Sequence, residues 1–279
     1  MKKIAALTMV RNDDFFLGKW TAYYGSLLGK ENLFIFFDGE DQKVPECTRG
    51  CFTKLLPRVA GNVQASDKRR IDIMSDFAAG LLERYDMVIG TDIDEFVIVD
   101  PALGKSLPEF LSGLDTGDFS SVSALGCDVI QNIRTEIGLD PDAPLLSQRR
   151  FARLSTRYTK ASVLCKPVQW GSGFHRIRKE NYHIVPGLYL FHFGCADMSF
   201  LGLKMDDTDL VERGWNHHLC KRRRMMTQLP CLPVRSWDKW TVRALWLQAR
   251  LRHCYAWNKP AMLGLRIVVE IPDRFSSLV

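Results

Sequence analysis

Continuous hydrophobic runs alternate with helical patterns along the first part of the chain. Residues 4–10, 32–37 and 86–91 are apolar runs with the length and composition of strands that are buried on both faces of a sheet. Between them, residues 15–28 and 66–84 carry hydrophobic side chains at the three- and four-residue spacing of a helix face. Strands that alternate with helices predict an α/β fold with a mostly parallel sheet flanked by helices.

The second part of the chain changes in pattern and in charge. Residues 119–128 and 187–193 are expected to form further strands, and the later pattern is helical. Residues 1–140 carry 15 Lys and Arg against 22 Asp and Glu, whereas the remainder carries 23 against 10 and is rich in tryptophan. We therefore expect a sheet-containing domain over residues 1–205 and a basic, Trp-rich helical extension over residues 206–279.

The composition is that of a soluble globular protein. Of the 279 residues, 46% are hydrophobic and 25% are charged, which excludes disordered, collagen-like and coiled-coil chains. No apolar run reaches the ~18 residues of a membrane-spanning helix, and the first run is too short for a signal peptide. The eight cysteines lack the paired spacing of a zinc site. We therefore expect a cytoplasmic protein with reduced thiols.

Acidic and amide side chains follow three of the predicted strands at the point where each strand ends. Asn12 and Asp13 follow the first strand, Asp38 follows the second, and Asp92 and Asp94 follow the third. Ligands of open α/β sheets bind beyond the carboxyl ends of the strands. The sequence therefore predicts a polar ligand site at this edge of the sheet.

Two carboxylates separated by one residue, Asp92 and Asp94, can reach a single divalent cation where a strand ends. Mg²⁺ and Mn²⁺ prefer a few carboxylate oxygens, with phosphate and water in the remaining positions. A surface turn is the alternative for such a short motif. Asp38 is either a turn residue before Gly39 or an acceptor for a nucleobase or ribose.

Basic and imidazole side chains supply further candidates. Arg11 and Arg70 could bind the oxygens of a diphosphate, although Arg70 could equally belong to a solvated helix face. His192 lies within an apolar strand, where it is either a core residue or a third metal ligand through neutral imidazole. His175 lies in a glycine-rich loop.

The order of these elements resembles a known family. An apolar strand precedes Arg11-Asn12, a second strand ends in Phe37-Asp38-Gly39, and a basic helix precedes Asp92-Ile93-Asp94-Glu95-Phe96; Phe191-His192-Phe193 and Lys204 follow. Over about residues 1–205 this arrangement resembles glycosyltransferase family 2-like proteins with a D-x-D-E-F signature. The resemblance implies a GT-A fold with a Rossmann-like sheet. It also implies metal-assisted sugar transfer from a nucleotide-diphosphate donor to a glycan or lipid-linked acceptor.

The resemblance also implies a role for each matching residue. Asp92, Asp94 and His192 would bind a Mn²⁺ or Mg²⁺ ion. The donor, with uridine diphosphate as the expected nucleotide, would be bound by Arg11, Asp38, Arg70, Asp92 and Lys204. Asp94 and Lys204 would assist departure of the diphosphate. Glu95 and His175 would contact the acceptor.

The proton acceptor has no match to the family pattern. Many inverting members carry it in a Glu-Asp pair late in the domain, and this chain has no such pair. Asp118, Asp128 and Asp197 are the candidates, and Asp128 is preferred because it ends a predicted strand. Inversion and retention both stay open.

Two other function classes fit parts of the sequence. A phosphatase of the haloacid dehalogenase type also places D-x-D after an apolar strand, with the first Asp as nucleophile. That strand normally lies near the N-terminus, whereas two predicted strands precede Asp92 here. Alternatively, the basic and aromatic residues 213–254 form a binding module. A helical subdomain with a solvated basic face is the other reading of these residues. As a binding module they would contact the inner face of an anionic membrane rather than nucleic acid, for which no recognition motif is present.

Overall fold

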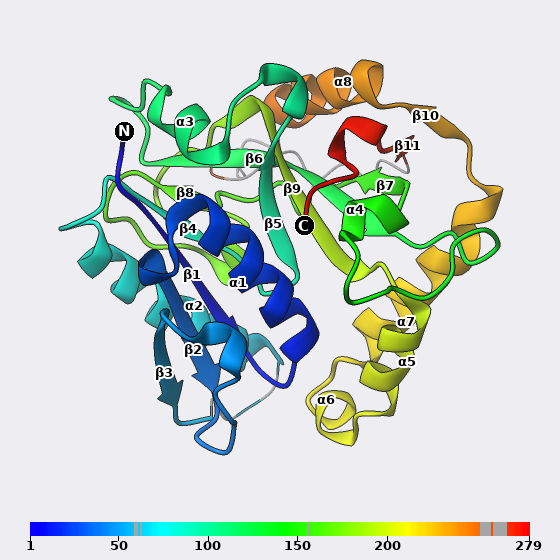
Figure 1. Cartoon of the computed structure of the whole chain (residues 1–279), viewed down its shortest axis with the longest axis horizontal. Helices are drawn as coiled ribbons and strands as arrows, with labels where there is room; N and C mark the ends of the chain where they lie inside the picture. Colours follow the sequence, from blue (N-terminus) through cyan, green and yellow to red (C-terminus); the bar gives the residue numbers. More distant parts are fainter. Residues whose placement is uncertain (59–60, 62, 156, 252–257, 259–266) are drawn as a thin grey trace.

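The first half of the chain alternates strands and helices in the predicted order (Figure 1). The computed structural model describes residues 1–279 except 59–60, 62, 156, 252–257 and 259–266. The elements of this half are β1 (Ile4–Val10), α1 (Asp14–Leu28), β2 (Leu33–Asp38), β3 (Phe52–Leu56), α2 (Val63–Leu81) and β4 (Met87–Gly90). The four strands pair in the order β3-β2-β1-β4, and all of these pairings are parallel.

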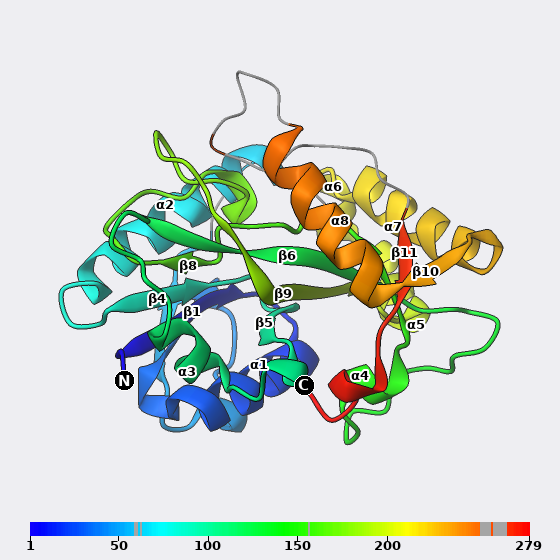
Figure 2. The same ribbon diagram turned by 90° about the horizontal axis from the view of Figure 1, so that it is seen from above.

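Side chains of β1 alternate between the two faces of this parallel sheet, because successive strand residues point to opposite sides. Ala6 belongs to the hydrophobic cluster that contains Trp20 of α1, whereas Leu7 belongs to the cluster that contains Met74 of α2. Figure 2 shows α1 and α2 on opposite sides of the sheet. All seven residues of β1 are therefore buried, which explains why its sequence is a continuous apolar run.

The sheet continues through strands of the second half of the chain. Beyond β4 lie β8 (Val163–Leu164), β6 (Ser121–Ile130), β7 (Phe151–Leu154), β11 (Val268–Glu270) and β10 (Val234–Ser236), in that order. From β4 to β11 these pairings are antiparallel. A long strand, β9 (Ile184–Cys195), pairs in parallel with β6 and antiparallel with β5 (Glu95–Val99). The predicted α/β fold, with helices flanking a sheet, is confirmed. Its first half is parallel and its second half is mixed.

Helices of the second half form two groups. In Figure 1, α5 (Met198–Asp206), α6 (Thr208–Glu212) and α7 (Asn216–Gln228) lie together at the lower right. The longer α8 (Trp237–Arg250) packs on β9, where the ring of Trp237 stacks on Phe191 with centroids 5.8 Å apart. Two short helices, α3 (Leu107–Ser112) and α4 (Leu145–Gln148), lie between strands. None of the helices in the described residues is long and apolar enough to cross a membrane.

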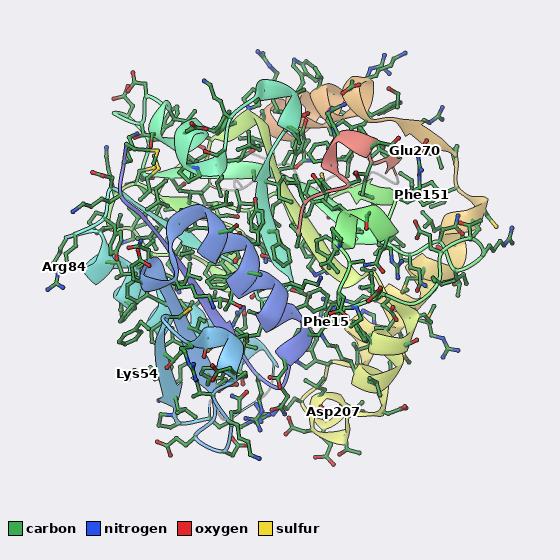
Figure 3. All side chains as sticks on the ribbon, in the orientation of Figure 1. Phe15, Lys54, Arg84, Phe151, Asp207 and Glu270 are labelled. Atoms are coloured by element: carbon green, nitrogen blue, oxygen red, sulfur yellow. The ribbon has the colours of Figure 1, made fainter. Side chains whose placement is uncertain are left out.

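Residues 206–279 contain the expected helices and also two short strands. β11 pairs with β7, and the paired residues Phe151 and Glu270 lie side by side in Figure 3. β10 pairs in turn with β11. This part of the chain is therefore joined to the main sheet, and the domain boundary after residue 205 stays a prediction.

Helix α1 anchors the segment that carries the D-x-D motif. The indole Nε1 of Trp20 donates to Oγ1 of Thr91 at 3.0 Å. Five residues beyond the motif's start, the hydroxyl of Tyr24 accepts from the amide of Val97 at 2.9 Å, and the hydroxyl of Tyr23 donates to the Val97 carbonyl at 2.8 Å. Both ends of residues 91–97 are thus held against one helix, which limits the positions available to Asp92 and Asp94.

Candidate active site

A cleft of about 1480 Å³ opens at the carboxyl ends of β1, β2 and β4. Its wall also includes residues of α2, α5, α6, α7, β6, β7, β9 and β11 and of the segments that contain Lys160 and His175. This is the edge of the sheet at which the sequence predicts a ligand site. The predicted site residues that line it are Arg11, Asp38, Arg70, Asp92, Asp94, Asp128, His175, His192 and Lys204.

Asp92 is held between two cations in this cleft. Its Oδ1 accepts from Nη1 of Arg70 at 2.6 Å, and its Oδ2 accepts from Nζ of Lys160 at 2.9 Å. Burial opposes ionisation of Asp92, but the charges of Arg70 and Lys160 outweigh it and hold the pKa well below the usual range. Asp92 is therefore an ionised carboxylate with both oxygens engaged.

Glu95 lies beneath the cleft rather than in it. Its side chain is 0% exposed, and its Oε1 is 2.7 Å from Nζ of Lys160. Burial raises the pKa of Glu95 to about 7, although the nearby Lys160 charge opposes the shift. Residue 95 begins the fully buried strand β5 and is not among the residues that line the cleft, and its contact with an acceptor stays a prediction. Its carboxylate instead helps to position Lys160.

A second carboxylate, Asp94, faces a histidine. Oδ2 of Asp94 is 3.5 Å from Nε2 of His192, and Oδ1 of Asp128 is 2.7 Å from Nδ1 on the other side of the ring. Burial opposes ionisation of Asp94, but the charges of His192, Lys204 and Arg222 lower its pKa overall. The ring of Tyr158 stacks on the imidazole with centroids 3.7 Å apart, which fixes its plane.

The contacts of His192 orient its ring. A carboxylate oxygen accepts hydrogen bonds, so Oδ1 of Asp128 accepts from Nδ1 of the imidazole. Nε2 then faces the cleft, 3.5 Å from Oδ2 of Asp94 and 3.4 Å from Nη2 of Arg222. The charge of Arg222, a second ring proton or a bound cation can each lie against this nitrogen and the Asp94 carboxylate. Asp94 and His192 are therefore candidates for metal ligands, with Asp128 orienting the imidazole.

Strand register explains why these groups meet. Glu95 of β5 pairs with His192 of β9, His192 pairs with Asp128 of β6, and Asp128 pairs with Arg153 of β7. Four ionisable residues therefore form a row across four neighbouring strands. Each comes from a segment that is distant in sequence, so no local motif contains the row.

The predicted set of three metal ligands is not assembled. Among the described residues, no group of three or more His, Cys, Asp and Glu side chains lies close enough to hold a metal ion. Asp92 is the residue that departs from the prediction, because its oxygens face Arg70 and Lys160. Asp94 and His192 lie near each other, and metal binding by these residues stays a prediction.

Arg222 of α7 reaches into the centre of the cleft. Its Nη2 lies 3.4 Å from Nε2 of His192. The glycine at position 194 leaves room for both side chains, since a Cβ there would lie 2.5 Å from Cε1 of His192 and 2.7 Å from Cζ of Arg222. Arg222 thus adds a positive charge beside Asp94 that the sequence prediction lacked.

The other predicted residues lie around this centre. Lys204 of α5 pairs with Oδ2 of Asp13 at 2.9 Å and so bridges to the start of α1. Arg11 donates to the Asp38 carbonyl at 2.7 Å and pairs with both carboxylate oxygens of Asp41. Burial, together with the charge of Lys160, lowers the pKa of His175 to about 3, so its ring is neutral.

Of the three candidates for the proton acceptor, Asp128 alone is among the residues that line the cleft. Asp197 caps the start of α5 and pairs with Arg149. Asp118 is exposed on the turn that precedes β6. Oδ1 of Asp128 is engaged by His192, which gives this carboxylate a positioning role besides the predicted catalytic one.

Lys160 and Arg222 are the site residues that sequence reasoning missed. Lys160 lies in a segment without hydrophobic periodicity, so no local signal marks it. Arg222 was detectable, because Leu219 and Met226 are both buried and lie three residues before it and four after it on one face of α7. Helical spacing thus distinguishes Arg222 from its neighbours in the basic run.

Comparison with known proteins gave weak structural similarities. No protein-family profile and no curated protein matches the chain. WbbM, a bifunctional glycosyltransferase in its apo form, aligns over 44% of this chain and 23% of its own length, with 15% identity and a TM-score of 0.27. A mannose-1-phosphate geranyltransferase from Thermus thermophilus aligns over 98% of this chain and 76% of its own, with 12% identity and a TM-score of 0.28. A putative glucose-1-phosphate thymidylyltransferase from Bacillus anthracis, in complex with a sucrose, aligns over 78% and 83%, with 10% identity and a TM-score of 0.29. Alignments this weak define no function for the chain.

Proposed function

We propose that the protein is a glycosyltransferase that moves a sugar from a nucleotide-diphosphate donor to an acceptor hydroxyl. The observation that carries the proposal is the Asp94–His192–Asp128 arrangement beside Arg222, at the sheet edge where open α/β sheets bind ligands. It combines ligands for a divalent cation with unusually dense positive charge, which is what a diphosphate leaving group requires.

The donor would lie across the ends of the parallel strands. Asp38 at the end of β2 and Arg11 after β1 suit the nucleoside, because a carboxylate can accept from ribose hydroxyls or a base. Arg70, Lys160 and Lys204 lie further toward the centre and suit the diphosphate oxygens. The ion pairs of these cations with Asp67, Asp92 and Asp13 fix the positions of their side chains.

Asp94 and His192 would hold Mn²⁺ or Mg²⁺, and such a cation would neutralise charge on the departing diphosphate. Arg222 and Lys204 act on the same charge from the protein side. Because these donors are fixed before the bond breaks, they stabilise the transition state without reorganising. Asp128 is proposed to orient His192 and stays the candidate for accepting the proton of the attacking hydroxyl.

Nucleotide binding tests this proposal. Thermal unfolding would be followed with UDP, GDP or TDP, each with Mn²⁺, Mg²⁺ or a chelator. A ligand at 100 times its Kd stabilises the folded state by about 2.7 kcal/mol. Stabilisation by one nucleotide that needs a metal and is lost in Asp94→Asn supports the proposal.

The matched control is Asp118→Asn, the same chemical change at an exposed carboxylate outside the cleft. Absence of any nucleotide response from folded wild-type protein would contradict the proposal. Release of phosphate from an aryl phosphate, lost in Asp92→Asn, would support the phosphatase alternative instead.

Peripheral membrane contact is proposed for the outer face of α8. Val242 is 69% exposed and Trp246 is 52% exposed, and Arg243 and Arg250 lie over neighbouring tryptophan rings. Apolar side chains rimmed by arginines suit the surface of an anionic membrane. Co-sedimentation with phosphatidylglycerol vesicles, reduced by Trp246→Ser and by high salt, tests this contact. Equal sedimentation of wild type and variant would contradict it.

A further inference from the structure

The guanidinium of Arg222 lies against the nitrogen of His192 that a metal ion would need. Its Nη2 is 3.4 Å from Nε2 of the imidazole, while Oδ1 of Asp128 accepts from Nδ1 on the other side of the ring. An arginine N–H can only donate, so in this contact Nε2 accepts and its lone pair points at the guanidinium. A divalent cation binds imidazole through that same lone pair. Arg222 and a cation therefore cannot hold Nε2 at the same time.

Asp94 is the second group for which Arg222 and a cation compete. Its Oδ2 is 3.5 Å from Nε2 of His192, and the charge of Arg222 helps to lower the pKa of this carboxylate. A cation held by both residues would lie beside the guanidinium, and two positive charges at such close range repel each other. Metal binding by Asp94 and His192 thus requires Arg222 to move away.

Arg222 is held less firmly than other cations of the cleft. Lys204 pairs with Asp13 at 2.9 Å, and Arg70 pairs with Asp92 at 2.6 Å. In the part of the chain that the structure describes, no Asp or Glu side chain forms an ion pair with Arg222. Its partner is an uncharged ring nitrogen at the long end of the range for hydrogen bonds. A stronger acceptor can therefore draw the guanidinium away.

A diphosphate is such an acceptor. The planar guanidinium binds two phosphate oxygens at once, and these charge-assisted hydrogen bonds are roughly twice as strong as neutral ones. Arg222 lines the same cleft as Asp94 and His192, so a diphosphate that enters the cleft comes within reach of its side chain. Movement of Arg222 to the diphosphate would leave both groups to a cation.

We propose that Arg222 closes the metal site of Asp94 and His192 in the free protein, and that a bound diphosphate opens the site by drawing the guanidinium away. The opening by a diphosphate rests on the proposed function, whereas the competition between Arg222 and a cation for Nε2 does not. The cation and the diphosphate then bind cooperatively, because each favours the arrangement that the other needs.

Titration of the full-length protein with Mn²⁺, first without nucleotide and then with saturating UDP, tests the proposal. The electron paramagnetic resonance signal of free Mn²⁺ measures binding independently of turnover. The variant is Arg222→Met, and Arg222→Gln is a second neutral replacement in case the first does not fold. Thermal unfolding of each protein checks that it is folded.

Two controls separate the contact with His192 from a general effect of charge. Lys204→Met removes a charge that lowers the pKa of Asp94 at least as strongly as that of Arg222, but Lys204 has its own partner in Asp13. Arg223→Met removes a charge from the same helix at an exposed position that does not line the cleft.

Without nucleotide, we expect Arg222→Met to bind Mn²⁺ at least about tenfold more tightly than wild type, because the cation no longer displaces a hydrogen bond from a charged donor. Lys204→Met and Arg223→Met should gain clearly less. Adding Asp94→Asn or His192→Gln to Arg222→Met should abolish the gain. With UDP the advantage of Arg222→Met over wild type should shrink, since the diphosphate moves Arg222 in the wild type.

Equal Mn²⁺ affinity of wild type and Arg222→Met would overturn the proposal, and joint binding of UDP and Mn²⁺ to the wild type would then leave the proposed function intact. An equal gain in Lys204→Met would also overturn it, because charge alone would explain the effect. An advantage that UDP does not diminish would refute the opening by a diphosphate. If Arg222→Met shows the gain but wild type binds no nucleotide, the competition stands and the proposed function fails.

Discussion

Oδ1 of Asp128 lies 2.7 Å from Nδ1 of His192, and the two residues pair directly on the parallel strands β6 and β9. Both side chains are almost completely buried, and both belong to strands in the centre of the sheet. Strand pairing therefore fixes the backbone of each partner before any side chain is placed. The imidazole presents Nε2 to the cleft as a consequence of this register.

Asp128→Asn separates the two roles of this carboxylate. If Asp128 positions His192, Mn²⁺ affinity measured by calorimetry with UDP should fall about 10- to 100-fold, because an amide holds the imidazole less strongly. Asp118→Asn should leave the affinity unchanged. Loss of turnover with full Mn²⁺ affinity would instead make Asp128 the proton acceptor.

Gly194→Ala should disturb Arg222 and His192 together. The added Cβ would lie 2.5 Å from Cε1 of His192 and 2.7 Å from Cζ of Arg222, so one or both side chains must move. We expect turnover to fall by up to about 10²- to 10³-fold, the usual cost of a lost transition-state donor, with cooperative unfolding retained. Gly202→Ala is the control, since a Cβ at this position of α5 meets no atom within 4 Å. Equal turnover in the two variants would show that the placement of Arg222 and His192 has no part in the reaction.

Glu95 should make stability depend on pH. Folding raises the pKa of Glu95 from 4.5 to about 7, so the folded state binds the proton more tightly than the unfolded state. The free energy of unfolding should therefore decrease as pH rises from about 4.5 to about 7 and level off above that range. Chemical denaturation of wild type and Glu95→Gln at each pH measures the contribution as a difference. Glu83→Gln, at an exposed position, should reproduce the wild-type slope. A Glu95→Gln slope equal to wild type would contradict the assignment.

Removal of Lys160 should lower the free energy of unfolding, because two carboxylates lose their ion-pair partner. Lys160→Met leaves Asp92 without one of its cations and Glu95 without its ion-pair partner, and breaking a buried pair typically costs about 3–5 kcal/mol. Adding Glu95→Gln to Lys160→Met should restore part of that stability, because one buried charge is removed. Urea denaturation of the two single variants and the double variant measures the coupling. Lys166→Met, which loses only an exposed contact to a carbonyl, should have little effect. Strict additivity of the two changes would argue against the pairing.

Local patterns in the sequence determined the strands, the helices and the edge of the sheet where the site lies. The run Ile4–Val10 is apolar except for Thr8 because both faces of β1 are covered, so burial is visible without a structure. Asp38, Asp92 and Asp94 follow strands of one parallel sheet, which places them at one edge. A periodic pattern and a strand direction suffice for these conclusions, since each depends on neighbours in sequence.

Only the tertiary structure decided which charges meet. Glu95 and Asp94 are adjacent in sequence, yet Glu95 faces Lys160 below the cleft and Asp94 faces His192. Arg222 belongs to a run of four basic residues. The packing of α7 directs the side chain of Arg222 toward the imidazole of His192. The extra strands β10 and β11 join the sheet because β11 pairs with β7, and no local sequence pattern predicts this pairing. Ion pairs and strand register join segments that are far apart in the chain, and their energies depend on burial that no local pattern specifies.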